Sequence, residues 1–211
     1  RKKDRVVVAV SGGKDSLALS VALSLRRKWL PIRYTLHAGI IEWHEYPIPS
    51  HIKEQLIEFF QILDISYTFL QASMIPESFK HRFNCYLCSR NRKRILFNEA
   101  DRKGIEKIAF GHHLDDLAET SLINICLRGK LDTMHPNQEF FNGKLSVIRP
   151  LCEVRESTIE KVVRRLELPV FSPPCPFKES NIRTKIKPII REFSHLNKYV
   201  REHIYASFWD T

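Results

Sequence analysis

The sequence lacks any run of apolar residues that approaches the ~20 needed to cross a membrane. It has only five cysteines in 211 residues, and a small odd number of cysteines in a chain of this length is not a disulfide framework. Internal repeats and low-complexity segments are absent as well. We therefore expect a soluble protein of the cytoplasm, with one main folded domain and a single large core.

Acidic residues are the scarcer charge, with 24 Asp and Glu against 34 Lys and Arg and a net charge of +10. The basic excess gathers between Lys80 and Lys107 and again between Arg183 and Arg201. Such clusters favour a polyanionic partner such as nucleic acid, although a solvated basic helix is their commoner cause. Charge alone leaves both readings open.

Two common phosphate-binding motifs are missing, since neither Gly-x-x-x-x-Gly-Lys-Ser/Thr nor Gly-x-Gly-x-x-Gly occurs at the first strand-to-helix turn. A different polar turn joins the apolar strand 6–10 to a helical run that begins at Leu17. Its glycines allow a sharp turn, and the backbone amides at the helix start attract anions. This turn predicts a nucleotide site made by Ser11, Gly12, Gly13, Lys14, Asp15 and Ser16.

The hydrophobic pattern alternates short strands with helices, which is typical of an α/β, doubly wound, mostly parallel sheet. We expect a polar loop over 132–144 and helices over 182–208. Ligands of such sheets lie beyond the carboxyl ends of the strands. His37, which ends the expected second strand, should therefore face the base or ribose of the nucleotide, and the alternative is a solvated histidine at the strand's end. The expected strands cover 6–10, 32–37, 66–70, 107–110 and 146–149.

Cys85 and Cys88 open a predicted helix, where the helix N-terminus and nearby arginines should lower thiol pKa values. A Cys-x-x-Cys pair is typical of a redox dithiol, half of a zinc site, or an iron–sulfur site, and two unrelated buried thiols are the alternative. Cys175 lies between prolines in a stiff loop that suits a fixed ligand. We assign Cys126 and Cys152 to core packing.

The segment 111–116, Gly-His-His-Leu-Asp-Asp, repeats the opening pattern of strand, glycine, polar residues and helix. Asp115 is a candidate general base or a partner of Mg²⁺, and the alternative is a pair of carboxylates stabilised by the helix dipole. Farther along, Ser157 and Glu160 predict a capping box at the start of another helix.

Taken together, these motifs resemble the tRNA 2-thiocytidine synthase family of PP-loop ATP pyrophosphatases, which is close to the tRNA 2-thiouridine synthases. They occur in the family's order and at similar spacing over most of the chain. The resemblance implies a fold of the adenine nucleotide alpha hydrolase type, with C-terminal helices. The matching segments are 11–16, 85–90, 111–116 with Glu119 and Thr120, 148–151, and 174–175.

The resemblance further implies a 4Fe-4S cluster held by Cys85, Cys88 and Cys175. One iron would have no protein ligand and would be open to hydrosulfide. ATP and Mg²⁺ would lie on the segment 11–16, with the adenine near His37 and Gly111. A domain over 1–176 would carry these sites, and a basic helical segment over 177–211 would pack on it.

The implied enzyme is an ATP-dependent tRNA sulfurtransferase that thiolates C2 of a pyrimidine, an anticodon-loop cytidine, through an adenylated intermediate and releases AMP and pyrophosphate. Lys14 and Arg92 would neutralise phosphate charge, Asp15 would orient Mg²⁺ or pyrophosphate, and Asp115 would act as general base. The sulfur donor would be inorganic sulfide or a cysteine desulfurase relay. The sequence leaves open whether the chain forms a homodimer.

Two other functions fit parts of the pattern. A lysidine-synthetase-like tRNA ligase shares the PP-loop and adenylates cytidine but needs no cysteines. An ATP- or RNA-binding regulatory protein with a structural zinc on the three cysteines needs no chemistry at all.

Overall fold

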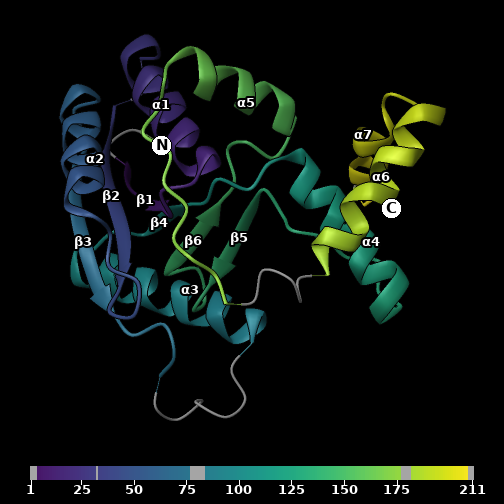
Figure 1. The fold of residues 1–211 in the computed structure, drawn as a ribbon, viewed down its shortest axis with the longest axis horizontal. Coiled ribbons are helices and arrows are strands. Elements are labelled where there is room, and N and C mark those ends of the chain that lie inside the picture. Colours follow the sequence, from purple (N-terminus) through teal and green to yellow (C-terminus); the bar gives the residue numbers. More distant parts are fainter. Residues whose placement is uncertain (1–3, 32, 77–83, 177–181, 209–211) are drawn as a thin grey trace.

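The computed structural model describes residues 4–31, 33–76, 84–176 and 182–208. It contains a six-stranded sheet with helices on both of its faces (Figure 1). The strands are β1 (Asp4–Val10), β2 (Tyr34–Trp43), β3 (Ser66–Ala72), β4 (Lys107–Ala109), β5 (Asn137–Phe140) and β6 (Leu145–Ile148). The helices are α1 (Lys14–Trp29), α2 (Ser50–Ile62), α3 (Cys85–Arg102), α4 (Leu114–Arg128), α5 (Glu156–Arg165), α6 (Arg183–Leu196) and α7 (Val200–Ala206).

The strand order is β3-β2-β1-β4-β6-β5, and every pairing except β5 with β6 is parallel. The predicted doubly wound, mostly parallel sheet is therefore confirmed. The chain moves outward from β1 to β2 and β3, and later returns to the other side of β1 through β4. This reversal leaves a crevice between the carboxyl ends of β1 and β4, which is where such sheets bind ligands.

Several elements differ from the prediction in their extent. Helix α1 begins at Lys14 rather than Leu17. Strand β2 continues to Trp43, and the sequence does not mark this end because a buried strand shows no polar alternation. The predicted loop 132–144 contains β5, which pairs antiparallel with β6 at the edge of the sheet. Its sequence, Asn-Gln-Glu-Phe, is polar because an edge strand is covered on one side at most.

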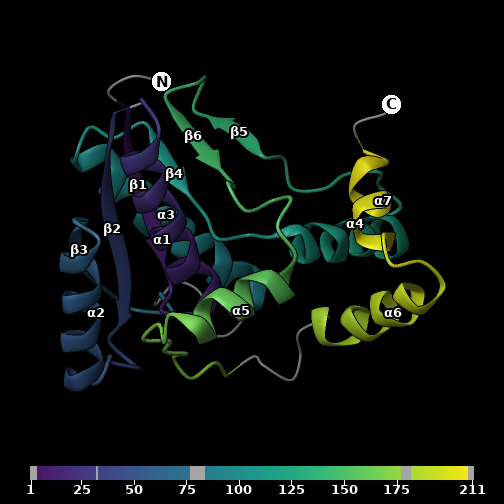
Figure 2. The ribbon, with the colours of Figure 1, turned by 90° about the horizontal axis from the view of Figure 1, so that it is seen from above.

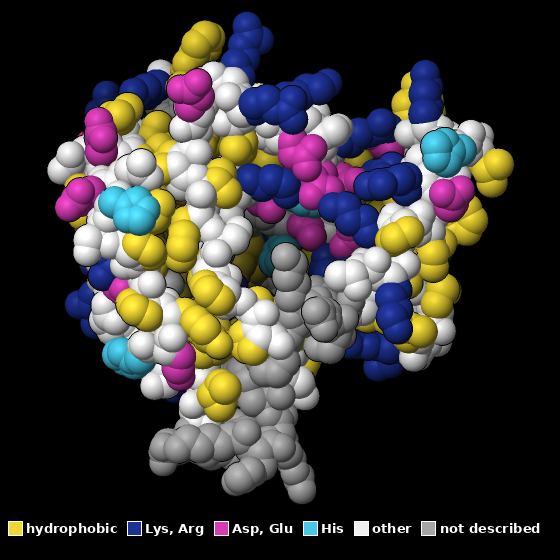
Figure 3. Space-filling view, viewed as in Figure 1, with side chains coloured by type: hydrophobic (Ala, Val, Ile, Leu, Met, Phe, Trp, Pro, Cys, Tyr) yellow, Lys and Arg dark blue, Asp and Glu magenta, His cyan; other side chains and the backbone are white. Residues whose placement is uncertain are grey.

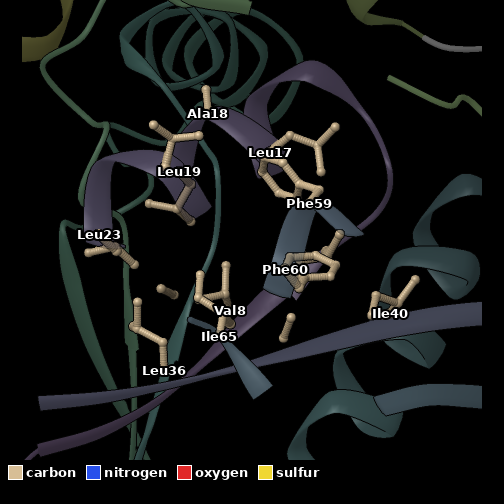
Figure 4. Packing of buried hydrophobic residues seen from close by; sticks show 14 of the residues in the cluster. Val8, Leu17, Ala18, Leu19, Leu23, Leu36, Ile40, Phe59, Phe60 and Ile65 are labelled. Atoms are coloured by element: carbon tan, nitrogen blue, oxygen red, sulfur yellow. The ribbon is translucent and has the colours of Figure 1, made fainter. Parts of the chain in front are cut away.

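The core has one layer on each face of the sheet. On one face α1, α2 and α5 pack against β1 and β2, with Leu17, Ile40 and Phe60 almost fully buried (Figure 4). On the other face α3 covers β1 and β4 through Leu96, and Leu96 also lies against Gly39 of β2. Burial of large aliphatic and aromatic side chains supplies most of the driving force for folding. This packing fixes the strand ends that carry the site.

Helices α4, α6 and α7 form a separate group beside the sheet (Figures 1 and 2). Ile186 and Ile190 of α6 pack on Ala118 of α4, and Tyr205 of α7 packs on Leu114. The predicted C-terminal helices are confirmed. The division of the chain at residue 176 remains a prediction, and residues 177–181 lie outside the described part.

Among the described residues, no helix combines the length and the apolar character that a membrane crossing requires. Cys152 is buried, as predicted. Cys126 is exposed, and its assignment to the core was wrong. It lies near the end of α4, where Ile125 and Leu127 are exposed too, so its apolar neighbours do not mark a buried face.

Candidate active site

The polar turn 11–16 closes on itself between β1 and α1. The Ser11 backbone N–H donates to Ser16 Oγ at 3.3 Å, and Ser16 Oγ donates to the Gly13 carbonyl at 2.9 Å. Gly12 has a φ of +81°, which favours glycine. A Cβ on Gly12 would lie 2.7 Å from the Phe171 carbonyl oxygen, and the Phe171 N–H donates to the Gly12 carbonyl. The turn is thus fixed against the loop that leads to Cys175.

A cavity of about 420 Å³ lies over the carboxyl ends of β1, β2 and β4. The turn 11–16 contributes Ser11, Asp15 and Ser16, and the segment after β4 contributes Gly111, His112 and Asp116. Trp43 lines it from the end of β2. Helix α3 and the loop with Pro173 and Cys175 complete the lining, with Cys85, Cys88, Ser89, Arg92, Lys93 and Leu96 on the helix.

All three predicted cysteine ligands line this cavity. Helix α3 begins at Cys85 because Asn84 caps it, accepting from the Leu87 N–H at 3.1 Å. Cys88 is buried against Trp43 and Met74, while Cys85 and Cys175 are exposed. Two of the three thiols therefore remain open to solvent from the cavity.

The pKa of Cys85 is raised, first by burial and then by the neighbouring Cys175 and Cys88. The predicted lowering by the helix N-terminus and the arginines is therefore wrong for Cys85, since desolvation and like charges dominate. Within the described residues, no three His, Cys, Asp or Glu side chains are close enough to hold one metal ion. Three thiolates around a four-iron cluster each bind a different iron, so they stand farther apart than around a single ion.

Gly111 brings the segment after β4 against the start of α1. A Cβ on Gly111 would lie 2.9 Å from both the backbone carbon and oxygen of Asp15. His113 and Asp116 form a capping box at α4, with the His113 N–H donating to Asp116 Oδ2 at 3.1 Å. The two polar turns are thereby joined at one wall of the cavity.

Asp116, rather than the predicted Asp115, lines the cavity. Asp115 is buried and accepts hydrogen bonds from Arg201 of α7 and from the Glu156 backbone N–H. Asp116 Oδ1 accepts from Arg183 of α6 at 2.9 Å. Side chains at adjacent positions of a helix point about 100° apart. Asp116 therefore faces the cavity, while Asp115 contacts α7 and the start of α5.

Lys14 also lies apart from the large cavity. Its Nζ pairs with Asp15 at 3.0 Å and with Glu156 at 2.9 Å, and it lines a second cavity of about 210 Å³ with Arg183 and Lys187. Sequence reasoning missed Glu156, because it placed the helix cap at Ser157; the helix begins at Glu156, so the predicted capping box is wrong. Burial raises the pKa of Glu156, but hydrogen bonds from Lys187 and Lys14 outweigh it and lower the pKa to about 2.

Arg92 lines the cavity, as the prediction of a phosphate contact requires. Its guanidinium lies over the Trp43 ring, 5.6 Å from the centroid, in a cation–π arrangement. Its Nε is buried and has no hydrogen-bond partner among the described residues. Trp43 was not predicted, because the expected second strand ended six residues before it.

His37 is in the middle of β2 rather than at its end, so the reason for placing it beside the nucleotide was wrong. Its Nδ1 lies 2.9 Å from Ser66 Oγ and its Nε2 lies 3.1 Å from Thr68 Oγ1, both on β3. Among the described residues His37 is not part of the cavity lining. Its position is that of a buried, hydrogen-bonded histidine of the sheet.

Replacing His37 with glutamine should flatten the pH dependence of folding stability. Burial and then Lys103 lower the pKa of His37 to about 4, against about 6.5 in the unfolded chain. This difference contributes about 3 kcal/mol to stability above pH 6.5, which is lost as the pH falls from 6.5 towards 4. Urea denaturation at pH 7.5 and pH 5 would measure the difference; an equally steep loss in the variant would show that another group is responsible.

Charged side chains surround the hollow between the sheet and the C-terminal helices (Figure 3). Lys187 donates to Glu156 at 2.6 Å, and Arg183 also contacts Glu119 at 3.1 Å. Part of the basic C-terminal cluster is therefore ion-paired around the second cavity. Lys185 and Arg191 on the same helix are exposed and have no ion pair within the described part of the chain.

Comparison with known proteins shows the family of this chain. The family model described as a PP-loop domain matches residues 1–187. The tRNA-cytidine(32) 2-sulfurtransferase of Alkalilimnicola ehrlichii is 35% identical over 97% of this chain and 66% of its own length. The protein of the same name from Paraburkholderia phymatum is 36% identical over 90% of this chain and 57% of its own. The chain thus spans less than two thirds of the length of these relatives.

A solved structure shows the same fold. The U34-tRNA thiolase NcsA from Methanococcus maripaludis, determined with its 4Fe-4S cluster, superposes with a TM-score of 0.81. It is 20% identical and is matched over all of this chain and 72% of its own. The chain belongs to the PP-loop family and, within it, is related to the tRNA-cytidine(32) 2-sulfurtransferases.

Proposed function

We propose that this protein transfers sulfur to C2 of a tRNA pyrimidine, an anticodon-loop cytidine, in a reaction that consumes ATP. The observation that carries the proposal is one cavity lined both by the PP-loop and by three cysteines from two distant segments. A tRNA-modifying reaction also implies a location in the cytoplasm. The names of the sequence relatives support the same substrate and chemistry.

The nucleotide side of the cavity suits adenylation of the base. The PP-loop hydroxyls and the free amides at the start of α1 would bind phosphate oxygens. In the first step the C2 oxygen of the base attacks the α-phosphorus, and the bond to pyrophosphate breaks. In the second step sulfide adds at C2, and the C2–oxygen bond breaks so that AMP leaves with the oxygen.

The acidic residues would hold Mg²⁺ and steer the phosphates. Asp15 and Asp116 both line the cavity, and carboxylate oxygens are ligands that Mg²⁺ prefers. Asp115 would act as a positioning residue rather than as the base, because Arg201 and the start of α5 already engage its oxygens. Arg92 would meet anionic charge with its unpartnered Nε.

The cysteine side suits an iron–sulfur cluster better than a single metal ion. Three thiols are a soft donor set, and burial and then the neighbouring Cys175 and Cys88 raise the pKa of Cys85. Iron would favour the thiolate forms and remove this cost. A 4Fe-4S cluster held by Cys85, Cys88 and Cys175 would leave one iron open to a sulfur atom that comes from inorganic sulfide or a desulfurase relay.

The two alternative functions are less well supported. A lysidine-type ligase gives no reason for three thiols to converge beside the nucleotide turn. A structural zinc requires ligands close enough to surround one ion, and the described residues offer no such group.

Nucleoside analysis of tRNA from a strain that lacks this protein tests the function. We expect 2-thiocytidine to disappear and to return when the wild-type gene is restored. Normal levels of every thiolated pyrimidine in that strain would refute the tRNA assignment. A missing lysidine with intact thiolation would point to the ligase instead.

A further inference from the structure

The cations around the second cavity are balanced by carboxylates. Lys14 and Lys187 both pair with Glu156, and Arg183 pairs with Asp116 and Glu119. Their charges are therefore compensated without any ligand. An anion that binds these three side chains would have to compete with the carboxylates.

The α3 wall of the large cavity is different. Arg92 and Lys93 line it, and neither has an ion pair within the described part of the chain. Arg149, at the end of β6, is almost fully buried, and its guanidinium donates to the His135 carbonyl and, at 3.3 Å, to Gln138 Oε1. Its Nε has no hydrogen-bond partner in the described segments. Buried positive charge without a counter-charge is costly, so such a wall suits an anion.

Lys93 is the best placed of these cations to meet a ligand. Its side chain is half-buried, and its ammonium donates no hydrogen bond to any described residue. Arg149 is not part of the cavity lining, and the Arg92 guanidinium is already stacked on Trp43. Burial and then Arg149 lower the pKa of Lys93, which is the direction expected of a cation that lacks an anionic partner.

His112 adds an uncharged hydrogen-bonding group beside Lys93. Its ring stacks on Phe110 with centroids 5.6 Å apart, and its Nδ1 is buried with no hydrogen-bond partner in the part of the chain that the structure describes. Burial lowers the pKa of His112 far enough to leave the imidazole neutral at pH 7. The cavity therefore presents the Lys93 ammonium and one neutral imidazole, and the PP-loop lines the same cavity.

We propose that Lys93 is a phosphate-binding residue that contacts the α-phosphate of the adenine nucleotide. The ligand class is a nucleoside 5′-phosphate, and the contact would stabilise the charge that moves onto the α-phosphate oxygens during adenylation. This assignment rests on the nucleotide site of the proposed function. It adds a lysine on α3 to the PP-loop as a second phosphate contact in the same cavity.

Calorimetric titration of the anaerobically purified protein with AMP and with adenosine tests the contact without RNA or turnover. The wild-type protein should bind AMP more tightly than adenosine. In Lys93→Gln the ratio of the two affinities should fall about tenfold, the loss typical of one hydrogen bond to a charged group. Lys93→Arg keeps the charge and should retain the preference for AMP.

Lys130→Gln is the matched control, because Lys130 is exposed and lies outside the cavity lining. The substitution removes the same charge as Lys93→Gln. Its affinity ratio should equal that of the wild type. Thermal denaturation of nucleotide-free Lys93→Gln should show a midpoint at or above that of the wild type, since an uncompensated cation has been removed. These results together separate phosphate binding from damage to the fold.

An unchanged AMP-to-adenosine ratio in Lys93→Gln would overturn the proposal. Loss of bound iron with an unchanged ratio would also overturn it and would assign Lys93 to charge compensation at the cysteines. If the wild-type protein binds neither ATP, AMP nor adenosine, the nucleotide site of the proposed function itself is wrong. That failure is visible before any variant is made.

Discussion

Replacing Cys175 with alanine is expected to remove most of the bound iron and to lower sulfur transfer more than about 100-fold. Residues that only support a metal centre typically account for 10- to 100-fold effects, so a direct ligand should exceed them. Cys175 comes from a separate loop and closes the set formed by Cys85 and Cys88 on α3. Iron and sulfide analysis of the anaerobically purified variant, with a thiolation assay, would measure both effects.

Cys126→Ala is the matched control for this prediction. Cys126 is an exposed cysteine outside the cavity lining, so its removal should leave iron content and activity at wild-type levels. A Cys175→Ala protein that keeps its full iron content would contradict the three-cysteine assignment. Equal losses in both variants would indicate a general effect of removing thiols.

Replacing Gly111 with alanine should weaken nucleotide binding between about tenfold and a hundredfold. The added Cβ would lie 2.9 Å from the Asp15 backbone, where no side chain can move aside to make room. The turn 11–16 and the segment after β4 would have to separate, and overpacking of this kind costs about 1–3 kcal/mol. Titration with ATP would measure the loss.

Gly129→Ala separates this effect from simple destabilisation. Gly129 ends α4 with a φ of +59°, and a Cβ there would meet nothing within 4 Å. The control should lose about 1 kcal/mol of stability from backbone strain and keep its nucleotide affinity. Wild-type ATP affinity in Gly111→Ala would contradict the proposed role of this close approach.

The sequence was sufficient for the parts of the site that are local. The glycines and hydroxyls of 11–16 lie between one strand and one helix, and Cys85 and Cys88 lie on one helical turn, so neighbouring residues determine both features. The alternation of strands and helices predicted the parallel sheet for the same reason. Cys175 was matched to the pair by family resemblance, since no local rule links residues this far apart.

The contacts that the sequence did not predict involve partners that are distant in the sequence. Asp115 and Asp116 are adjacent and chemically alike, and Asp115 contacts Arg201 while Asp116 contacts Arg183, both from the C-terminal helices. Lys14 was expected to meet phosphate, but Glu156 from α5 engages it. No local pattern reports such pairings, because tertiary contacts determine them.

His37 illustrates a different limit. A buried parallel strand is apolar throughout, so the sequence 34–43 does not show where the strand ends. A histidine within it was therefore read as a residue at the strand's end. Both nitrogens of its buried ring lie within hydrogen-bond distance of hydroxyl groups on β3, those of Ser66 and Thr68.

The most direct test of the proposed function is an anaerobic reaction of the protein with ATP, sulfide and a tRNA that lacks thiolation. AMP and 2-thiocytidine are then quantified in the same sample. We expect equal amounts of AMP and 2-thiocytidine, and neither product when tRNA or ATP is omitted. Release of AMP with tRNA present but without any thiolated base would contradict the proposed function, as would thiolation that does not require ATP.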